Sequence, residues 1–272
     1  MAIKDSINDE YHKQFSYYTS SYEDNYDCSS LNFLHTGTSE KFISALIKEI
    51  NNHPAVNHPY LIKLSKGLFP NPDEAIKDYA HQYSFYSLWF VRYLKGVIKS
   101  MPSKRLELEL IENIKEEEGD ENAIELKKRP HVEIFQHFKK SIGVDEIYIA
   151  KNPPSTTAIL WRNLFLQKCD SDILGVGIGA IGLATEFIVP RIYTYITKSI
   201  ENQSNFPDSS SLFFRLHIDC DQAHAQKIID ITTEIAENIA SREAIRFGVI
   251  SALNLRNAFW DSQHSRALLK TK

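Results

Sequence analysis

The sequence predicts an all-α protein with a single helical domain, and three observations support this fold class. Apolar residues recur at helical spacing through most of the chain, and no segment alternates apolar and polar residues convincingly as a half-buried strand does. Capping residues and prolines mark the starts of about seven to eight helical segments. The connections are short, and no linker divides the chain. We therefore expect a bundle over residues 39–272, preceded by a Tyr-, Ser- and Asp-rich arm at residues 1–38.

In the first half of the chain we expect helices over residues 39–50, 73–100 and 104–118. Thr38 and Ser103 precede the first and third of them and are good N-caps. The second helix is dense in aromatic side chains, which indicates burial on more than one side and therefore a central position. These aromatic residues are Tyr79, Tyr83, Phe85, Tyr86, Trp89, Phe90 and Tyr93.

In the second half, a charged connector at residues 121–130 ends at a proline, and helices follow to the end of the chain. The expected helices are one that starts at His131, one near 156–168, one capped by Asp170 or Asp172 that runs to about 201, one capped by Ser209–Ser211 that runs to about 239, and a last one holding Phe247 to Trp260.

Composition restricts the class of protein. The 272 residues carry a net charge of −4, so a general nucleic-acid-binding surface is not favoured. The three cysteines are far apart and form no CxxC pair, which argues against a disulfide framework and a zinc ribbon. The N-terminal residues are polar, and the longest uncharged run, residues 173–185, is too short to span a bilayer. We expect a cytoplasmic protein without a membrane partner.

The most informative motif is the HxxxDxxH of His217, Asp221 and His224. At 100° per residue these three positions fall within a sector roughly 60° wide on one helical face. Apolar neighbours indicate that the same helix packs into a core. Two imidazoles and a carboxylate on a partly buried stripe suit a transition metal, and a solvated polar face is the alternative.

Glu186 lies in the otherwise apolar stretch GVGIGAIGLATEFIVPRIY. A buried carboxylate without a partner costs several kcal/mol, so a cation, a metal ion or a hydrogen-bond donor must lie near it. Arg191 or a lysine elsewhere in the chain is as reasonable a partner as a metal ion. The glycines of this stretch form no GxGxxG motif, and we expect them to allow the close approach of another helix or a ligand.

Two further groups can join such a site. His131 opens an amphipathic helix, where a surface or capping histidine is the ordinary interpretation. Glu116, Glu117 and Glu118 end the helix before it, and carboxylates at a helix C-terminus oppose the macrodipole. A bound cation would remove that conflict, whereas a solvated acidic run is the alternative. The combined set supplies three imidazoles and three carboxylates: Glu117, His131, Glu186, His217, Asp221 and His224.

The segments EEEGD…PHVEIFQHF, GLATEFIVPRIY, HxxxDxxH and AFWD resemble the haem-oxygenase-like non-haem diiron oxidases and oxygenases, relatives of thiaminase-type and pyrroloquinoline-quinone-synthase-type proteins. The resemblance covers about residues 55–265. It implies a seven-helix haem-oxygenase-like fold and iron ligands at His131, Glu186, His217, Asp221 and His224. The sixth ligand is expected at Glu117, with Glu116 or Glu121 as alternatives because the connector to His131 is long.

The resemblance further implies two Fe ions, or one Fe and one Mn, that activate O2 to oxidise or cleave a small organic substrate. A fatty acid, an amino acid, an amine and a self-derived tyrosine all remain open as substrates. We expect an external electron donor as a partner, and we expect the chain to form a homodimer. Tyr83, Tyr86, Trp89, Tyr93 and Tyr193 are candidates for the pocket, although core packing explains most of them as well.

Three other functions compete with this prediction. A thiaminase-type hydrolase would use a cysteine nucleophile, such as Cys169 or Cys220, and would need no metal ligands. A cofactorless quinone-synthase-type oxidase would not need so many carboxylates. A non-enzymatic metal-binding interaction protein would keep the fold and use the ion only for structure. Iron content and O2 consumption with substrate separate these functions.

Overall fold

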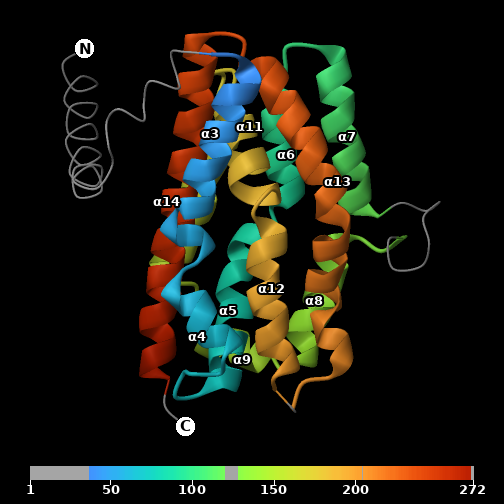
Figure 1. Ribbon diagram of the computed structural model, residues 1–272. Coiled ribbons are helices and arrows are strands. Elements are labelled where there is room, and N and C mark those ends of the chain that lie inside the picture. Colours follow the sequence, from blue (N-terminus) through green and yellow to red (C-terminus); the bar gives the residue numbers. More distant parts are fainter. Residues whose placement is uncertain (1–36, 120–127, 204, 271–272) are drawn as a thin grey trace, which may run out of the picture.

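The computed structural model describes residues 37–119, 128–203 and 205–270. Within the last range, it describes the backbone but not the side chains of residues 219–224. The described residues form a helical bundle with no β-strand (Figure 1). The expected arm at residues 1–38 lies almost entirely outside them. Its last residue, Thr38, caps α3 (Ser39–Asn52) through a hydrogen bond from the Lys41 amide, as predicted.

The described helices outnumber the seven to eight predicted because several long segments are interrupted. The expected helix 73–100 is two helices, α5 (Pro72–Ser87) and α6 (Phe90–Ile98), which a turn at Leu88 and Trp89 separates. Two short helices, α4 (Pro59–Ser65) and α9 (Glu146–Lys151), were not predicted. The remaining α-helices are α7 (Lys104–Glu118), α8 (His131–Ser141), α10 (Thr156–Cys169), α11 (Val176–Ile178), α12 (Val189–Glu201), α13 (Leu212–Ile235) and α14 (Ile239–Leu269).

One predicted cap is wrong, and another is at the expected place but lacks its side-chain hydrogen bond. Neither Asp170 nor Asp172 starts the helix that leads to residue 201. Asp170 follows α10 as its C-cap residue and lies beside α6, where Arg92 donates two hydrogen bonds to its carboxylate (2.9 and 2.6 Å). Ser211 is the N-cap residue of α13, as predicted, but its side chain makes no capping hydrogen bond to that helix, and residues 208–211 form a short 3-10 turn.

Apolar packing surrounds a central segment made of α11, a π-helix (η4, Gly179–Glu186) and α12. The π-helix contacts both long C-terminal helices, α13 and α14. Every residue of η4 is buried. The stretch Val176–Glu201 has the length and mean hydropathy (1.3) of a membrane span, but 83% of its apolar window is buried inside the bundle, as in the core segment of a soluble protein.

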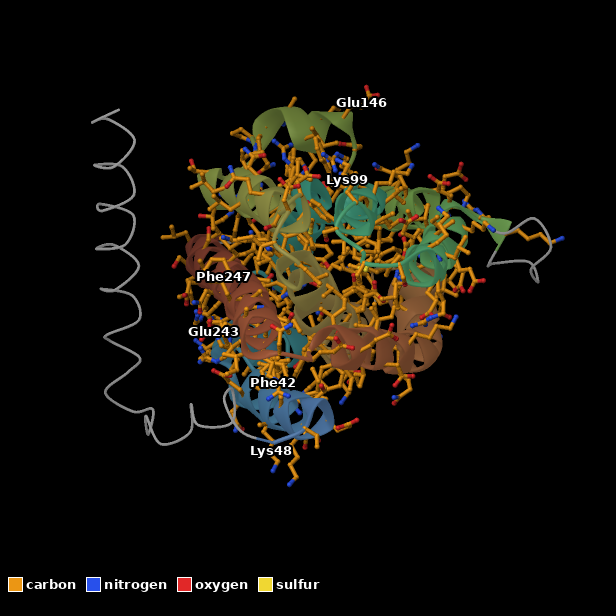
Figure 2. The ribbon with its side chains drawn as sticks, turned by 90° about the horizontal axis from the view of Figure 1, so that it is seen from above. Phe42, Lys48, Lys99, Glu146, Glu243 and Phe247 are labelled. Carbon is orange, nitrogen blue, oxygen red and sulfur yellow. The ribbon has the colours of Figure 1, made fainter. Side chains whose placement is uncertain are left out.

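Glycines allow this central segment to approach its neighbours, as expected. A β-carbon at Gly179 would collide with the backbone carbonyl of Ile245 on α14, and one at Gly248 would collide with the carbonyl of Val176. The two backbones are therefore in direct contact. Figure 2 shows the bundle from above, with Lys48 of α3 pointing outward, whereas Phe42 of the same helix is fully buried.

Two histidines join the start of the bundle to α14. The Nδ1 atoms of His53 and His58 accept hydrogen bonds from the amides of Ala55 (3.2 Å) and Tyr60 (3.0 Å) and so cap two short helices. Because an amide can only donate, both rings carry their proton on Nε2, which donates to Asn254 and to Asp261 on α14 (3.1 Å each).

These caps predict a loss of stability in acid. Burial lowers the pKa of both histidines, so the unfolded chain takes up protons before the folded one does. Their contribution is complete above the unfolded pKa of about 6.5 and is lost as pH falls toward the lower folded values. The double variant His53→Asn, His58→Asn keeps a capping oxygen that does not titrate. Urea unfolding should show that wild type loses stability relative to this variant between about pH 7.5 and 5.

The exposed His137→Asn variant serves as the control and should keep the wild-type pH profile. A constant free-energy difference between wild type and the double variant across this pH range would contradict the capping explanation.

Candidate metal centre

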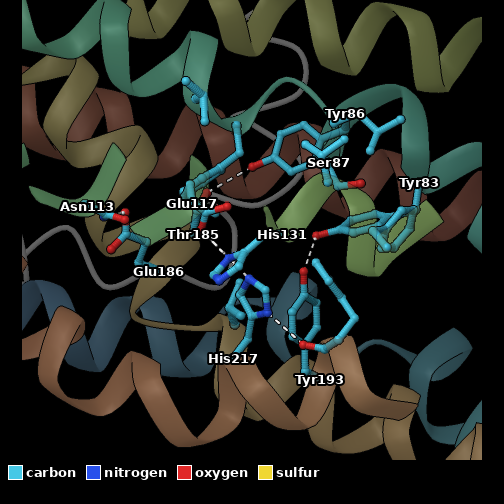
Figure 3. Close-up of a pocket in the computed structure, with 17 residues that line it drawn as sticks. Tyr83, Tyr86, Ser87, Asn113, Glu117, His131, Thr185, Glu186, Tyr193 and His217 are labelled. Carbon is cyan, nitrogen blue, oxygen red and sulfur yellow. Dashed lines mark hydrogen bonds and ion pairs between the residues drawn. The ribbon is translucent and has the colours of Figure 1, made fainter. Parts of the chain in front are cut away.

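Three side chains of metal-ligand type converge inside the bundle. Glu117 comes from the last turn of α7, His131 is the first residue of α8, and His217 lies in the second turn of α13. Their ligand atoms all lie within 4.8 Å of one another. The Glu117 Oε1 atom is 3.0 Å from His131 Nδ1 and 3.9 Å from His217 Nε2 (Figure 3).

The end of α7 and the start of α8 are held together by Gly119. This residue ends α7 with a φ of +90°, a conformation that glycine adopts without strain. Its α-carbon faces the backbone of residues 128–130, where a β-carbon would lie only 3.0 Å from the Pro130 nitrogen. Pro130 then leads directly into α8. Glu117 and His131 are therefore neighbours because one helix stops and the next starts at the same place.

The orientation of the His217 ring is fixed by a hydrogen bond on the nitrogen that faces away from Glu117. Its Nδ1 atom lies 2.7 Å from the carbonyl oxygen of Phe213, one turn earlier on α13. A carbonyl can only accept, so Nδ1 carries the proton and the Nε2 lone pair faces Glu117. Metal-bound histidines are commonly held in this way by a hydrogen bond on the second ring nitrogen.

Glu186, the last residue of the π-helix, lines the same pocket. Its Oε1 atom accepts a hydrogen bond from Asn113 (2.9 Å), and its Oε2 atom has no hydrogen-bond partner among the described residues. Burial, and then the charge of Glu117, raise the pKa of Glu186 to about 8. The alternative pairing with Arg191 is wrong, because Arg191 donates to Asn51 and Asn57 on the surface.

The other predicted ligands are placed less completely. The side chains of Asp221 and His224 lie outside the described residues. Helix α13 is continuous from residue 212 to 235, so both positions keep the i+4 and i+7 spacing from His217. Of the alternative glutamates, Glu116 lines a small cavity behind Glu186, and Glu121 lies outside the described residues. Only Glu117 of these glutamates joins the described group of three.

The pocket has a largely apolar lining with polar side chains set into it, among them Tyr193, whose ring lies 5.6 Å from that of His217. The unfilled space of about 650 Å³ around these residues includes open solvent, so the enclosed part of the pocket is much smaller. Of the five aromatic candidates, Tyr83, Tyr86 and Tyr193 line it, whereas Trp89 and Tyr93 are not among its lining residues. The apolar lining consists of Leu88, Phe90, Val91, Val132, Phe135, Val189 and Phe213.

Sequence reasoning missed two polar residues of this region. Asn113 lies four residues before Glu117 on α7, and that helical spacing is a signal that places both on one face. Arg256 is fully buried on α14, yet a single arginine in a helix gives no such signal because arginines are mostly exposed.

The buried thiol of Cys169 does not favour a cysteine hydrolase. Cys169 is fully buried at the end of α10 and does not line the pocket. Burial also raises the pKa of its thiol, whereas a nucleophilic cysteine needs a lowered one. The side chain of Cys220 lies outside the described residues.

Comparison with known proteins identifies the class. Residues 77–257, more than half of the chain, match the family described as iron-containing redox enzymes with a haem-oxygenase-like fold, and the chain belongs to this family. The predicted family and fold class are thereby confirmed.

Among its relatives, the 4-aminobenzoate synthase of Chlamydia pneumoniae is 23% identical over 74% of this chain and 84% of its own. The 4-chloro-allylglycine synthase of Streptantibioticus cattleyicolor is 20% identical over 82% of each chain. A solved CADD-like protein of unknown function from Nostoc punctiforme superposes with a TM-score of 0.67 at 17% identity, covering 83% of this chain and 98% of that one. A TenA homologue from Pseudomonas syringae gives 0.64 at 15% identity, with 85% and 98% covered.

The raised pKa of Glu186 predicts how metal-free protein responds to alkali. Between the unfolded pKa of about 4.5 and the folded pKa of about 8, the folded chain holds a proton that the unfolded chain has lost, so stability falls as pH rises. Glu186→Gln mimics the protonated form. Chemical denaturation should show it gaining stability over wild type by up to roughly 4 kcal/mol as pH rises from 5 to 9.

Glu112→Gln, a substitution of an exposed residue on α7, is the control and should show little of this gain. If Glu186→Gln and wild type kept parallel profiles over the whole pH range, Glu186 would be ionised in the metal-free protein.

Proposed function

We propose that this protein is a non-haem diiron oxidase or oxygenase that activates O2 to oxidise or cleave a small organic substrate. The observation that carries the proposal is the convergence of Glu117, His131 and His217, with ligand atoms within 4.8 Å of one another, inside the bundle. Membership of a family of iron-containing redox enzymes supports the same conclusion. Its synthase relatives support an enzymatic role over a purely structural metal site.

The donor set fits iron. Imidazole and carboxylate ligands without cysteine suit a redox-active ion in a helical core rather than structural zinc. The second oxygen of Glu186 has no partner among the described residues, and a cation would satisfy it. We propose that Glu117, His131, Glu186, His217, Asp221 and His224 hold two ions. Asp221 and His224 enter this set through their spacing on α13.

The protein side of the chemistry follows from the pocket. Bound here, two Fe ions, or Fe and Mn, would supply reductive activation of the co-substrate O2, for which an external electron donor would provide the electrons. The Phe213 carbonyl keeps the His217 Nε2 lone pair aimed at the centre. Glu186 releases its proton when a cation arrives, because that charge replaces the proton. The apolar walls limit the water beside the centre and hold the substrate next to it.

Two alternatives share the fold. A cofactorless quinone-synthase-type oxidase has no need for an acid with a raised pKa beside two imidazoles. A non-enzymatic metal-binding protein has no need for a pocket beside the centre. Iron content and substrate-dependent O2 consumption remain the discriminating measurements.

The first test is the metal content. Protein loaded anaerobically with Fe(II) should bind close to two irons and develop a transient visible absorption on exposure to O2. His217→Ala and Glu186→Ala should each abolish the absorption and lower the iron content while circular dichroism stays unchanged, because each removes one ligand. Metal analysis and stopped-flow spectroscopy check this.

His137→Ala, which removes an exposed histidine from the same helix as His131, should retain the iron and the absorption. Full iron and full reactivity in both ligand variants would overturn the proposed centre.

The stoichiometry also tests the part of the site that rests on spacing. Because Glu117, His131 and His217 already form one group, His224→Ala should leave one ion bound and remove the other. Anaerobic titration should therefore find about one iron per chain instead of two. A variant that still bound two irons tightly would exclude His224 from the centre.

A further inference from the structure

Glu186 borders a second space besides the pocket. A small cavity lies behind it, with lining residues from both α7 and α13. Glu186 and Asn113 line the cavity as well as the pocket, so this hydrogen-bonded pair separates the two spaces. Figure 3 shows both side chains together, on the side of the pocket away from Tyr83. The candidate centre can therefore be reached from two directions.

The cavity follows the helix faces that carry the candidate ligands. Ile228 and Ile231 line it from α13, four and seven residues beyond position 224, so they continue the face of the HxxxDxxH motif. From α7 it is lined by a single helical face, which carries Glu109, Asn113 and Glu116. The cavity thus leads along both helices toward the place where the proposed ligands meet.

Long exposed side chains cover the outer end of this cavity, along what we term the α7–α13 seam. Lys227 of α13, an exposed lining residue, lies 3.9 Å from the carboxylate of Glu112 on α7. Arg105 of α7 forms an ion pair with Glu234 of α13, and the two helices lie side by side (Figure 1). Ion pairs between exposed side chains are weak because solvent screens them. They cover the seam without sealing it.

The seam is acidic on both of its sides. On α7, Glu109, Glu112 and Glu116 lie along it, so carboxylates outnumber the cations Arg105 and Lys227. A surface groove between α3 and α13 continues this character. No lysine, arginine or histidine is among its described lining residues, whereas its acidic ones are Glu40, Asp230, Glu234 and Glu237. Such a surface raises the local concentration of cations.

The mouth of the pocket has the opposite character. Its lining residues that reach solvent are mostly apolar, and they include Leu88, Phe90, Val91 and Val132. A hydrated divalent cation gains nothing from such a surface, whereas an organic molecule does. The two approaches to Glu186 therefore suit two different kinds of ligand.

We propose that metal ions enter the centre through the α7–α13 seam, where Glu109, Glu112 and Glu116 attract a hydrated divalent cation and pass it to Glu186. The inference rests on the proposed function for the presence of ions in the centre. Glu186 is buried and lines the cavity, and its Oε2 atom has no hydrogen-bond partner among the described residues, so it can receive the ion. The organic substrate then uses the apolar mouth.

The test measures how fast metal-free protein takes up Co(II), which binds histidine and carboxylate ligands and absorbs visible light. Stopped-flow mixing with Co(II) alone compares wild type with the double variant Glu109→Gln, Glu112→Gln. The variant should take up Co(II) about fivefold more slowly at low ionic strength, because it has lost two attracting charges. Salt at about 0.5 M should bring the two rates within about twofold. Both proteins should finally bind equal numbers of ions, since neither residue is a proposed ligand.

Glu133→Gln combined with Glu146→Gln is the matched control. It removes the same net charge from exposed positions on α8 and α9, away from the seam, and should keep the wild-type uptake rate. Val132→Trp narrows the apolar mouth at an exposed position and should also leave the rate unchanged.

Equal uptake rates in wild type and the Glu109, Glu112 double variant at low salt would overturn the proposed route. Equal slowing in the matched control, or slow uptake in Val132→Trp, would overturn it as well. Each of these results leaves the number of bound ions, and hence the proposed function, in place. A wild-type protein that bound no Co(II) would instead remove the centre together with its route.

Discussion

The structure depends on holding a carboxylate in the apolar centre of a helical bundle. Glu186 is fully buried, and its only described hydrogen bond comes from the neutral amide of Asn113. Desolvation raises its pKa to about 8, so the metal-free bundle tolerates it by keeping it protonated near neutral pH. A side chain of this kind has high free energy without a cation and low free energy with one. The fold is therefore prepared for a positive ion at this place.

The backbone around Glu186 explains how this position is fixed. The π-helix η4 widens the turn just before Glu186, and such turns are frequent at functional sites. The Thr185 hydroxyl bonds to the carbonyl of Ala180, five residues earlier, and also accepts from Tyr86 and Arg256. Close backbone contact with α14 at Gly179 allows little movement. The carboxylate is thus aimed by packing on both sides of the turn.

Much of this arrangement could be predicted from the sequence, and the remainder could not, for physical reasons. The caps at Thr38 and Ser103 and the start of α8 at His131 were predictable because capping is local. The shared helical face of His217, Asp221 and His224 could be predicted because the helical repeat depends only on spacing within one segment. The π-helix was missed because it arises from tertiary contacts, and Asp170 was misassigned because Arg92 lies 78 positions away in sequence.

The choice of Glu117 among its neighbouring glutamates also could not be predicted from local sequence. A run of three glutamates offers no local reason to choose one. The choice is made by the rotation at which α7 stops beside α8, which brings Glu117 to His131. Asn113, one turn earlier, then reaches Glu186. These pairings depend on how three helices cross, which no single segment encodes.

The two buried ionisable side chains of this region, Glu186 and Arg256, are kept apart by the turn that contains Thr185 and Glu186. Thr185 and Glu186 are adjacent in sequence, yet Thr185 bonds to Arg256 on α14 whereas Glu186 bonds to Asn113 on α7. Consecutive side chains on a helix point in different directions, so the turn presents one residue to each side. Were Arg256 to pair with Glu186, the carboxyl would ionise and both groups would be satisfied internally. Their separation leaves the second oxygen of Glu186 without a hydrogen-bond partner among the described residues, and a bound cation would satisfy it.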